Sequence, residues 1–195
     1  TSVDEASVKN LPGVKVVQVK DFLALVACGD GAAQRAARAV KAQRTGGSGL
    51  PEQSKLIETL RTTADSAKET LVTKGTLVEP RPQDAKTVTA SYFWPMQSHA
   101  SIGPSCAVAD VNTDAATIWT ASQGTHGNRN TFARFLGLPK EKVRLIYIEG
   151  SGCYGMNGHE DAAADAAILS RAVGRPVGVP GSREDEHGWD TKGPP

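Results

Sequence analysis

The sequence predicts a mixed fold of helices and short strands, of the α/β or the α+β class, and three observations support this. Residues 13–19 and 21–27 are short, apolar and rich in β-branched side chains, which is typical of strands. Residues 106–121 form two strand-like runs on either side of Asn112-Thr113-Asp114, a pattern that predicts a hairpin. Alanine-rich stretches whose apolar residues have helical spacing follow in both halves of the chain.

Composition excludes several classes of protein. The chain has 195 residues, of which 39% are hydrophobic, enough for one medium domain or two small ones. Its net charge is +1 with lysine and arginine scattered, so nucleic acid is not an expected partner. Three distant cysteines do not suggest a disulfide framework, and no apolar run approaches the ~20 residues of a membrane span. Because the chain begins at Thr1 and ends in TKGPP, we expect it to be a piece of a longer protein.

The N-terminal strands lead into a predicted helix at residues 30–43. Its apolar face contains four small or β-branched residues: Ala32, Ala36, Ala39 and Val40. Residues 44–50, RTGGSGL, break this pattern. Pro51 suits the first turn of a short exposed helix, and the polar residues 61–83 are typical of a surface connection.

From residue 87 the pattern becomes more regular. Residues 87–94 alternate as a strand does and come before the hairpin. A helix is expected at 125–139, ended by Gly137 and the proline after it. Its packing face is predicted to contain three apolar residues: Phe132, Phe135 and Leu136.

A strand, a glycine-rich loop and a second helix follow. The strand is expected at 143–148, and the helix is expected to begin at His159 and to end at Gly174. A last strand is predicted at 175–179. The helix has one face of small and apolar residues, which permits close packing: Ala164, Ala167, Ile168 and Ala172.

The glycine-rich loop, IEGSGCYGMNG, contains the spacing G-x-G-x-x-G that is found in dinucleotide-binding folds. In those folds the third glycine lies in the first turn of the helix, but here Met-Asn-Gly follows Gly155. An acidic residue is also expected about 20 positions further on, and Arg175 stands there. The loop is therefore not predicted to bind NAD or FAD. The glycines instead predict close backbone approach to another bulky ligand, with a plain surface turn as the alternative.

Three stretches resemble the molybdenum hydroxylase family, which includes xanthine dehydrogenase and aldehyde oxidase: SYFWPMQSHASIGPSCAVADV, the run from IWTASQG to SRAVGRPV, and SREDE. The resemblance is to molybdopterin-binding large subunits of the isoquinoline oxidoreductase, nicotinate dehydrogenase and aldehyde dehydrogenase type. It implies an α+β fold. Residues 1–43 would be the end of a small hammerhead-like α/β domain, 44–86 a linker and connecting helix, and 87–195 the first part of a mixed α/β molybdopterin-binding domain.

The same resemblance assigns site residues. Gln123 matches the glutamine whose side-chain amide donates a hydrogen bond to an oxo ligand of molybdenum without adding charge. Tyr154 and Gly155 match a Phe-Gly step whose backbone amides approach the molybdenum and its dithiolene, although tyrosine replaces the commoner apolar ring. Cys153 would either line the pocket or be a structural thiol. The cofactor-binding residues implied are Gln123, Gly124, Gly152, Cys153, Tyr154 and Gly155.

Two histidines are candidates for the substrate pocket. His99 lies in the segment SHASIGP, and His126 lies near a helix start just after Gln123, where a surface position is an equal alternative. The sequence contains no C-x-x-C or H-x-x-x-H spacing, so a zinc site is not predicted, and no residue is expected to bind metal directly.

The resemblance implies a function for the assembled protein. This chain would help to bind molybdopterin, in its cytosine dinucleotide form, in an enzyme that hydroxylates an aldehyde or an electron-poor N-heterocycle with oxygen from water. The family's base glutamate lies beyond the matched region, so no catalytic residue is expected here and the chain alone should be inactive.

Partners and an alternative function follow from the same resemblance. Implied partners are the rest of the large subunit, an iron–sulfur small subunit with [2Fe-2S] clusters, a flavin or cytochrome c electron-transfer subunit, and a small-molecule substrate. The resemblance slightly favours a periplasmic or membrane-associated enzyme over a cytoplasmic one. The alternative function is a non-catalytic α/β binding or assembly module on the same scaffold.

Overall fold

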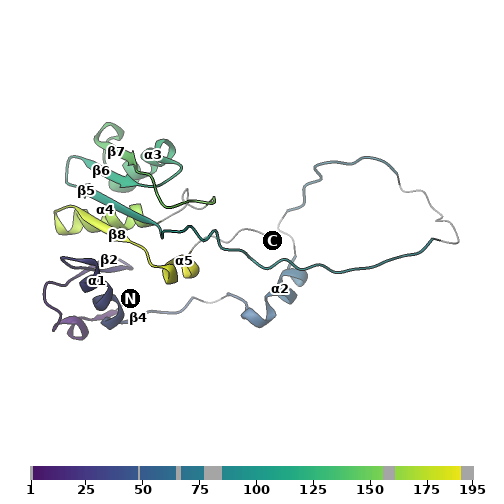
Figure 1. The fold of residues 1–195 in the computed structure, drawn as a ribbon, viewed down its shortest axis with the longest axis horizontal. Helices are drawn as coiled ribbons and strands as arrows, with labels where there is room; N and C mark the ends of the chain where they lie inside the picture. Colours follow the sequence, from purple (N-terminus) through teal and green to yellow (C-terminus); the bar gives the residue numbers. More distant parts are fainter. Residues whose placement is uncertain (1, 48, 65–66, 77–84, 156–160, 190–195) are drawn as a thin grey trace. The chain divides into compact units, whose positions relative to one another are not determined.

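A computed structural model describes residues 2–47, 49–64, 67–76, 85–155 and 161–189 (Figure 1). The chain forms two compact units, one made of Thr1–Gln43 with Phe93–Pro195 and the other of Arg44–Tyr92. Helices occur together with antiparallel and mixed sheets, which confirms the predicted α+β class. None of the described helices is long and apolar enough to cross a membrane.

A four-stranded sheet with the order β7-β6-β5-β8 organises the larger unit. Its strands are β5 (Cys106–Val111), β6 (Ala116–Thr120), β7 (Val143–Tyr147) and β8 (Val177–Pro180). β5 and β6 form the predicted antiparallel hairpin, β6 runs parallel to β7, and β8 is antiparallel to β5. The hairpin turn is held by Asn112, whose side-chain Oδ1 accepts hydrogen bonds from the N–H groups of Asp114 and Ala115, both at 2.8 Å.

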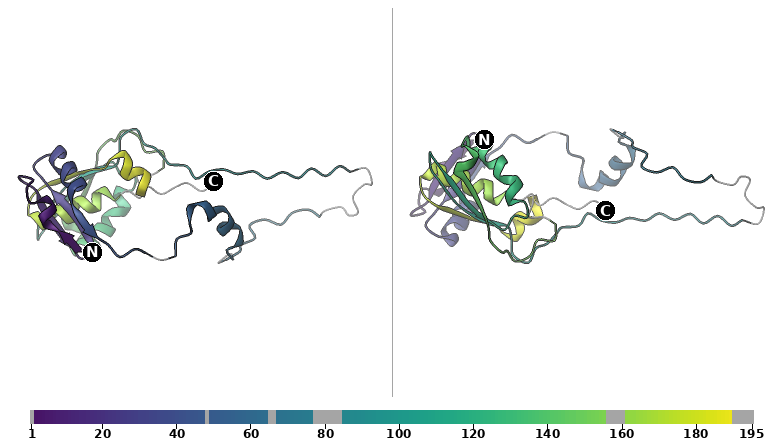
Figure 2. Two further views of the ribbon diagram at one scale, coloured as in Figure 1. Left: turned by 90° about the horizontal axis from the view of Figure 1, so that it is seen from below. Right: turned by 90° about the horizontal axis from the view of Figure 1, so that it is seen from above.

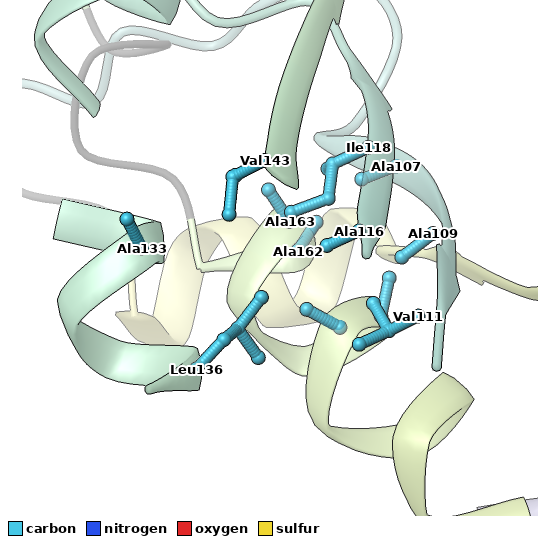
Figure 3. Close-up of a cluster of buried hydrophobic side chains, with 12 residues drawn as sticks. Ala107, Ala109, Val111, Ala116, Ile118, Ala133, Leu136, Val143, Ala162 and Ala163 are labelled. Atoms are coloured by element: carbon cyan, nitrogen blue, oxygen red, sulfur yellow. The ribbon is translucent and has the colours of Figure 1, made fainter. Parts of the chain in front are cut away.

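Two helices share one core with this sheet. α3 (Thr125–Leu136) and η3 (Lys140–Lys142) lie in the connection from β6 to β7, and α3 contacts β7, whereas α4 (Ala162–Val173) contacts β5 and β8. Figure 3 shows this core, in which Ile118 and Val143 are almost wholly buried among alanines from β5, β6 and both helices. Because the alanine side chains are small, α4 can lie close to the sheet.

Both helices end at the predicted glycines, which adopt the left-handed conformation with φ of +62° at Gly137 and +69° at Gly174. The packing face predicted for α3 is only partly correct. Leu136 is buried and Phe132 packs against the core, but Phe135 is 50% exposed and contacts Phe132 edge to face. Ala133 takes the buried position instead.

The packing face predicted for α4 is also partly wrong. Ala167 is buried as expected, but Ala172 is exposed. The buried residues are Ala162, Ala163, Ala166, Ala167, Leu169 and Ser170. The buried surface is wider than one stripe because Leu169 belongs to a second core, outside the one that α4 shares with the main sheet.

The second core joins the predicted N-terminal hairpin to the larger unit. β2 (Lys15–Val19) and β3 (Phe22–Val26) pair antiparallel, and Val17 packs with Leu169 and Val177. Figures 1 and 2 show the hairpin beside α4 and β8. α1 (Asp30–Ala39) follows, with Ala36 fully buried on the predicted face.

The helix predicted at 30–43 is too long. It stops at Ala39, because Lys41–Gln43 forms β4 and pairs antiparallel with β1 (Ser2–Asp4). The hydroxyl oxygen of Ser7, in η1 (Glu5–Val8), accepts a hydrogen bond from the N–H of Lys41 at 3.0 Å. These contacts join residues more than thirty positions apart, so local helical spacing does not reveal them.

The smaller unit contains η2 (Gln53–Lys55) and α2 (Leu56–Thr62), so the short helix begins a few residues after Pro51. The strand predicted at 87–94 is wrong, because these residues pair with no other backbone among the described residues. Tyr92, Phe93 and Trp94 are exposed. An alternating pattern forms a strand only where a neighbouring strand completes its hydrogen bonds.

Candidate functional site

The carboxyl ends of β6 and β7 lie at the same edge of the main sheet, because these strands are parallel. Thr120 pairs with Tyr147, and the N–H of Ile148 donates to the carbonyl of Thr120 at 3.0 Å. Two loops leave the sheet here, residues 121–124 after β6 and residues 148–155 after β7. Ligands of sheets with parallel strands commonly bind outside the carboxyl ends of those strands. This edge is therefore the candidate site.

The first loop places Gln123 just before α3. Ser122 is buried, and its hydroxyl oxygen accepts hydrogen bonds from the N–H of Gly124 and from Nδ2 of Asn128, both at 3.2 Å. The carbonyl of Gly124, the N-cap of α3, accepts from the N–H of Asn128 at 2.8 Å. These bonds hold the backbone on both sides of Gln123, whose side chain is exposed.

The glycine loop contacts the Gln123 turn and has conformations that favour glycine. A Cβ atom on Gly150 would lie 2.7 Å from the Cβ of Ala121, so the two loops touch at their starts. Gly152 and Gly155 have φ of +112° and +102°, which residues with a Cβ rarely adopt. Tyr154 is also left-handed, with φ of +53°, and its ring lies over Gly152. The glycines leave this backbone uncovered, as the sequence predicts for close approach to a ligand.

A third segment, residues 99–105, begins by running antiparallel to the glycine loop. Three pairs of residues meet: His99 with Gly155, Ser101 with Cys153, and Gly103 with Ser151. The Ser101 hydroxyl donates to the carbonyl of Cys153 at 3.1 Å. A Cβ on Gly155 would lie 3.3 Å from Cδ2 of His99, and one on Gly103 would lie 2.7 Å from Oγ of Ser151. The spacing of two residues is that of neighbouring antiparallel chains.

The structure brings some predicted site residues together and separates others. Cys153 is half-buried, and its Sγ accepts a hydrogen bond from the N–H of Gly155 at 3.3 Å. His99 is half-buried against Gly155, whereas Tyr154 is 59% exposed. His126 is exposed in the first turn of α3. The Met-Asn-Gly step and the helix start expected at His159 lie outside the described residues.

Sequence reasoning missed α5 (Arg183–Trp189), which contacts the 99–105 segment. The N–H of Asp185 donates to Oγ of Ser182 at 3.1 Å, and the N–H of Ser182 donates to Oδ2 of Asp185 at 2.9 Å. This reciprocal pair is a capping box. The spacing Ser-x-x-Asp in SREDE could therefore have revealed the helix.

One acidic group near the site has an altered pKa. Asp165 lies in the first turn of α4, and burial, assisted by the charge of Asp161, raises the pKa of its carboxyl from 3.8 to about 6. The described residues contain no group of three or more His, Cys, Asp or Glu side chains placed to hold a metal ion.

The model of the molybdopterin cofactor-binding domain matches residues 63–195, more than half of the chain. The chain belongs to this family. The matched region of this molybdopterin cofactor-binding chain includes the 99–105 segment, the Gln123 turn, the glycine loop and α5.

Relatives of known name agree with the family. Over 194 residues, 98% of this molybdopterin cofactor-binding chain, it is 39% identical to a nicotinate dehydrogenase subunit of Pseudomonas putida, and it covers 16% of that protein. Over 97 residues, 49% of the chain, it is 37% identical to the aldehyde oxidoreductase molybdenum-binding subunit PaoC of Escherichia coli, of which it covers 13%. It therefore spans about a sixth or less of these relatives.

A solved structure shares the fold. Quinoline 2-oxidoreductase from Pseudomonas putida 86 matches 95% of this chain with a TM-score of 0.68 and 20% identity, and the match covers 29% of that chain. At this identity the likeness establishes the arrangement of helices and strands. The assignment of residue roles depends on the geometry of the sheet edge.

Proposed function

We propose that this chain is a segment of the large subunit of a molybdenum hydroxylase and forms part of the wall that holds the molybdopterin cofactor. The assembled enzyme hydroxylates an aldehyde or an electron-poor N-heterocycle and takes the oxygen from water. In this division, residues 1–43 are the end of a hammerhead-like domain, 44–86 a linker with a connecting helix, and 87–195 the first part of the cofactor-binding domain.

One observation carries the proposal. Gln123 and the glycine loop are separated in the sequence by a helix and a strand, yet they leave the same edge of the sheet and touch at Ala121 and Gly150. This contact puts a neutral amide donor beside a loop whose backbone is uncovered at Gly152 and Gly155. The family resemblance assigns these same residues to one site.

The residues present fit an anionic cofactor with a bulky ring system. Residues 150–155 carry no carboxylate, and the conformations of Gly152 and Gly155 keep side chains off the loop backbone. Backbone N–H groups and the Gln123 amide supply donors without bringing a competing charge. When bound, the cofactor supplies the redox chemistry, and these residues bind and orient it. Gly124, Cys153 and Tyr154 complete the binding set.

The remaining assignments concern parts of the enzyme outside the described contacts. His99 contacts Gly155, which supports a position next to the substrate pocket, whereas the exposed His126 is a weaker candidate. We propose the cytosine dinucleotide form of the cofactor, a partner subunit with [2Fe-2S] clusters, and a flavin or cytochrome c subunit as electron acceptor. The base glutamate is proposed to lie outside this chain.

The test is to purify the native protein that contains this chain and to determine the intact mass of each subunit and its molybdenum and pterin contents. About one molybdenum per large subunit is expected, together with oxidation of an aldehyde or an N-heterocycle that incorporates ¹⁸O from labelled water. A native complex without molybdenum would refute the proposal. The isolated 195-residue chain should hold no stoichiometric molybdenum and should not turn over. Robust activity in that chain would show that the base has been misplaced.

A further inference from the structure

We infer that α5 positions the glycine loop through the 99–105 segment, with Arg183 and Glu186 as positioning residues. Its consequence for cofactor binding rests on the proposed function, whereas the mechanical link between α5 and the loop does not.

The first step of the link joins α5 to the segment. Nη2 of Arg183 donates to the carbonyls of Ser101 and Ile102, the latter at 2.9 Å. Oε1 of Glu186, a buried carboxylate, accepts a hydrogen bond from the N–H of Ser105 at 2.8 Å. One short helix therefore holds the segment at both ends. Hydrogen bonds that involve a charged group are stronger than neutral ones, which suits this role.

A backbone bond reinforces the same end of the segment. The N–H of Gly181, two residues before α5, donates to the carbonyl of Ser105 at 2.8 Å. A Cβ on Gly181 would lie 2.9 Å from that carbonyl oxygen, so the approach requires glycine. Ser105 is thus fixed through its N–H by Glu186 and through its carbonyl by Gly181.

The second step joins the segment to the loop, and Ser101 is the shared residue. Ser101 is 1% exposed; Arg183 binds its carbonyl, and its own hydroxyl donates to the carbonyl of Cys153. Cys153 lies between Gly152 and Gly155, the two positions with positive φ. A displacement of Ser101 therefore reaches the part of the loop that is proposed to approach the cofactor.

The loop needs such support because its own sequence provides little. Glycine has the largest conformational freedom of any residue in the unfolded chain, so a loop rich in glycine loses much entropy when it is ordered. The described loop contributes no side chain to either buried core, and Tyr154 is largely exposed. Contacts from outside must therefore hold it in one conformation.

The test uses the complete protein with its partner subunits and compares Arg183→Ala with Glu184→Gln, a matched change at an exposed residue of the same helix. Hydrogen exchange is followed in peptides that cover residues 99–105 and 150–155, and cofactor retention is measured as molybdenum and pterin content after mild heating. Arg183→Ala should raise exchange about tenfold or more in both peptides and speed cofactor loss, whereas Glu184→Gln should change neither. Arg183→Lys keeps a cationic donor and should recover much of the protection.

Ser101→Ala is the second variant and decides the matter if Arg183→Ala does not fold. It keeps the carbonyl that Arg183 binds and removes the hydroxyl that reaches Cys153, so exchange should rise in 150–155 and stay low in 99–105. Unchanged exchange in 150–155, in either variant, overturns the inference and leaves the proposed function standing. Faster exchange in both peptides of Arg183→Ala with undiminished cofactor retention supports the positioning link and overturns the proposed role of the loop.

Discussion

Replacing Gly155 with alanine or valine should weaken cofactor binding. Its φ of +102° lies outside the left-handed well that other residues occasionally use, and strained conformations of this kind cost about 1–3 kcal/mol. The new Cβ would also lie 3.3 Å from Cδ2 of His99, a tight contact that the two methyl groups of valine would worsen. Valine should therefore have the larger effect.

This strain translates into an expected loss of affinity. If only the native loop conformation binds the cofactor, the apparent dissociation constant rises by the inverse of the fraction of molecules that keep it. A cost of about 1–3 kcal/mol corresponds to roughly 5- to 150-fold weaker binding. Because a tightly held cofactor stays saturated through a change of that size, the rate of cofactor release in mild denaturant is the measurement to use. It is followed by the pterin and molybdenum that pass through a desalting column.

Gly137→Ala provides the control for backbone strain alone. Gly137 has φ of +62° at the end of α3, and a Cβ there would meet nothing within 4 Å. Its replacement should cost about 1 kcal/mol of folding free energy without speeding cofactor release. Equal release rates for Gly155→Val and Gly137→Ala would refute the reasoning and return the glycine loop to being a surface turn.

Three further changes test other parts of the structure. Gln123→Ala in the complete enzyme should lower turnover about tenfold or more with the cofactor still bound, as steady-state kinetics and molybdenum content would report; unaltered turnover would remove Gln123 from the site. Asp165→Asn should stabilise the fold at pH 7.5, because a raised pKa means that ionisation is less favourable in the folded state, a penalty absent below about pH 4 and complete above about pH 6. The shift of about two units corresponds to at most about 3 kcal/mol, which solvent screening reduces to about 1 kcal/mol, and urea unfolding that gave the same gain at pH 4 would contradict this account. Ser170→Ala should cost about 1–3 kcal/mol in the same assay, because the N–H of Val111 loses the buried acceptor that it contacts at 2.8 Å; a variant as stable as the parent would show that this bond is replaced.

The elements that could be predicted from the sequence are those that local chemistry specifies. Asn112 accepts from two backbone N–H groups of the hairpin turn, and Gly137 and Gly174 end their helices in the left-handed conformation. The strand expected at 87–94 and the helix end expected at 43 failed for the opposite reason. A strand depends on which other backbone lies beside it, and alternation of side chains does not report that.

The candidate site has the same division. Gln123 and the glycine loop could be named from resemblance and glycine spacing, but nothing in the local sequence predicts that Ala121 meets Gly150 or that Ser101 meets Cys153. Those contacts follow from the parallel pairing of β6 and β7, which sets both loops at one edge. The stretches 99–105, 121–124, 148–155 and 183–189 each form by local rules, but they make a site only where the register of the sheet and the cap of α5 are kept. Substitutions that disturb either one should therefore affect the cofactor without touching it, which is why hydrogen exchange in the glycine loop discriminates between positioning and direct contact.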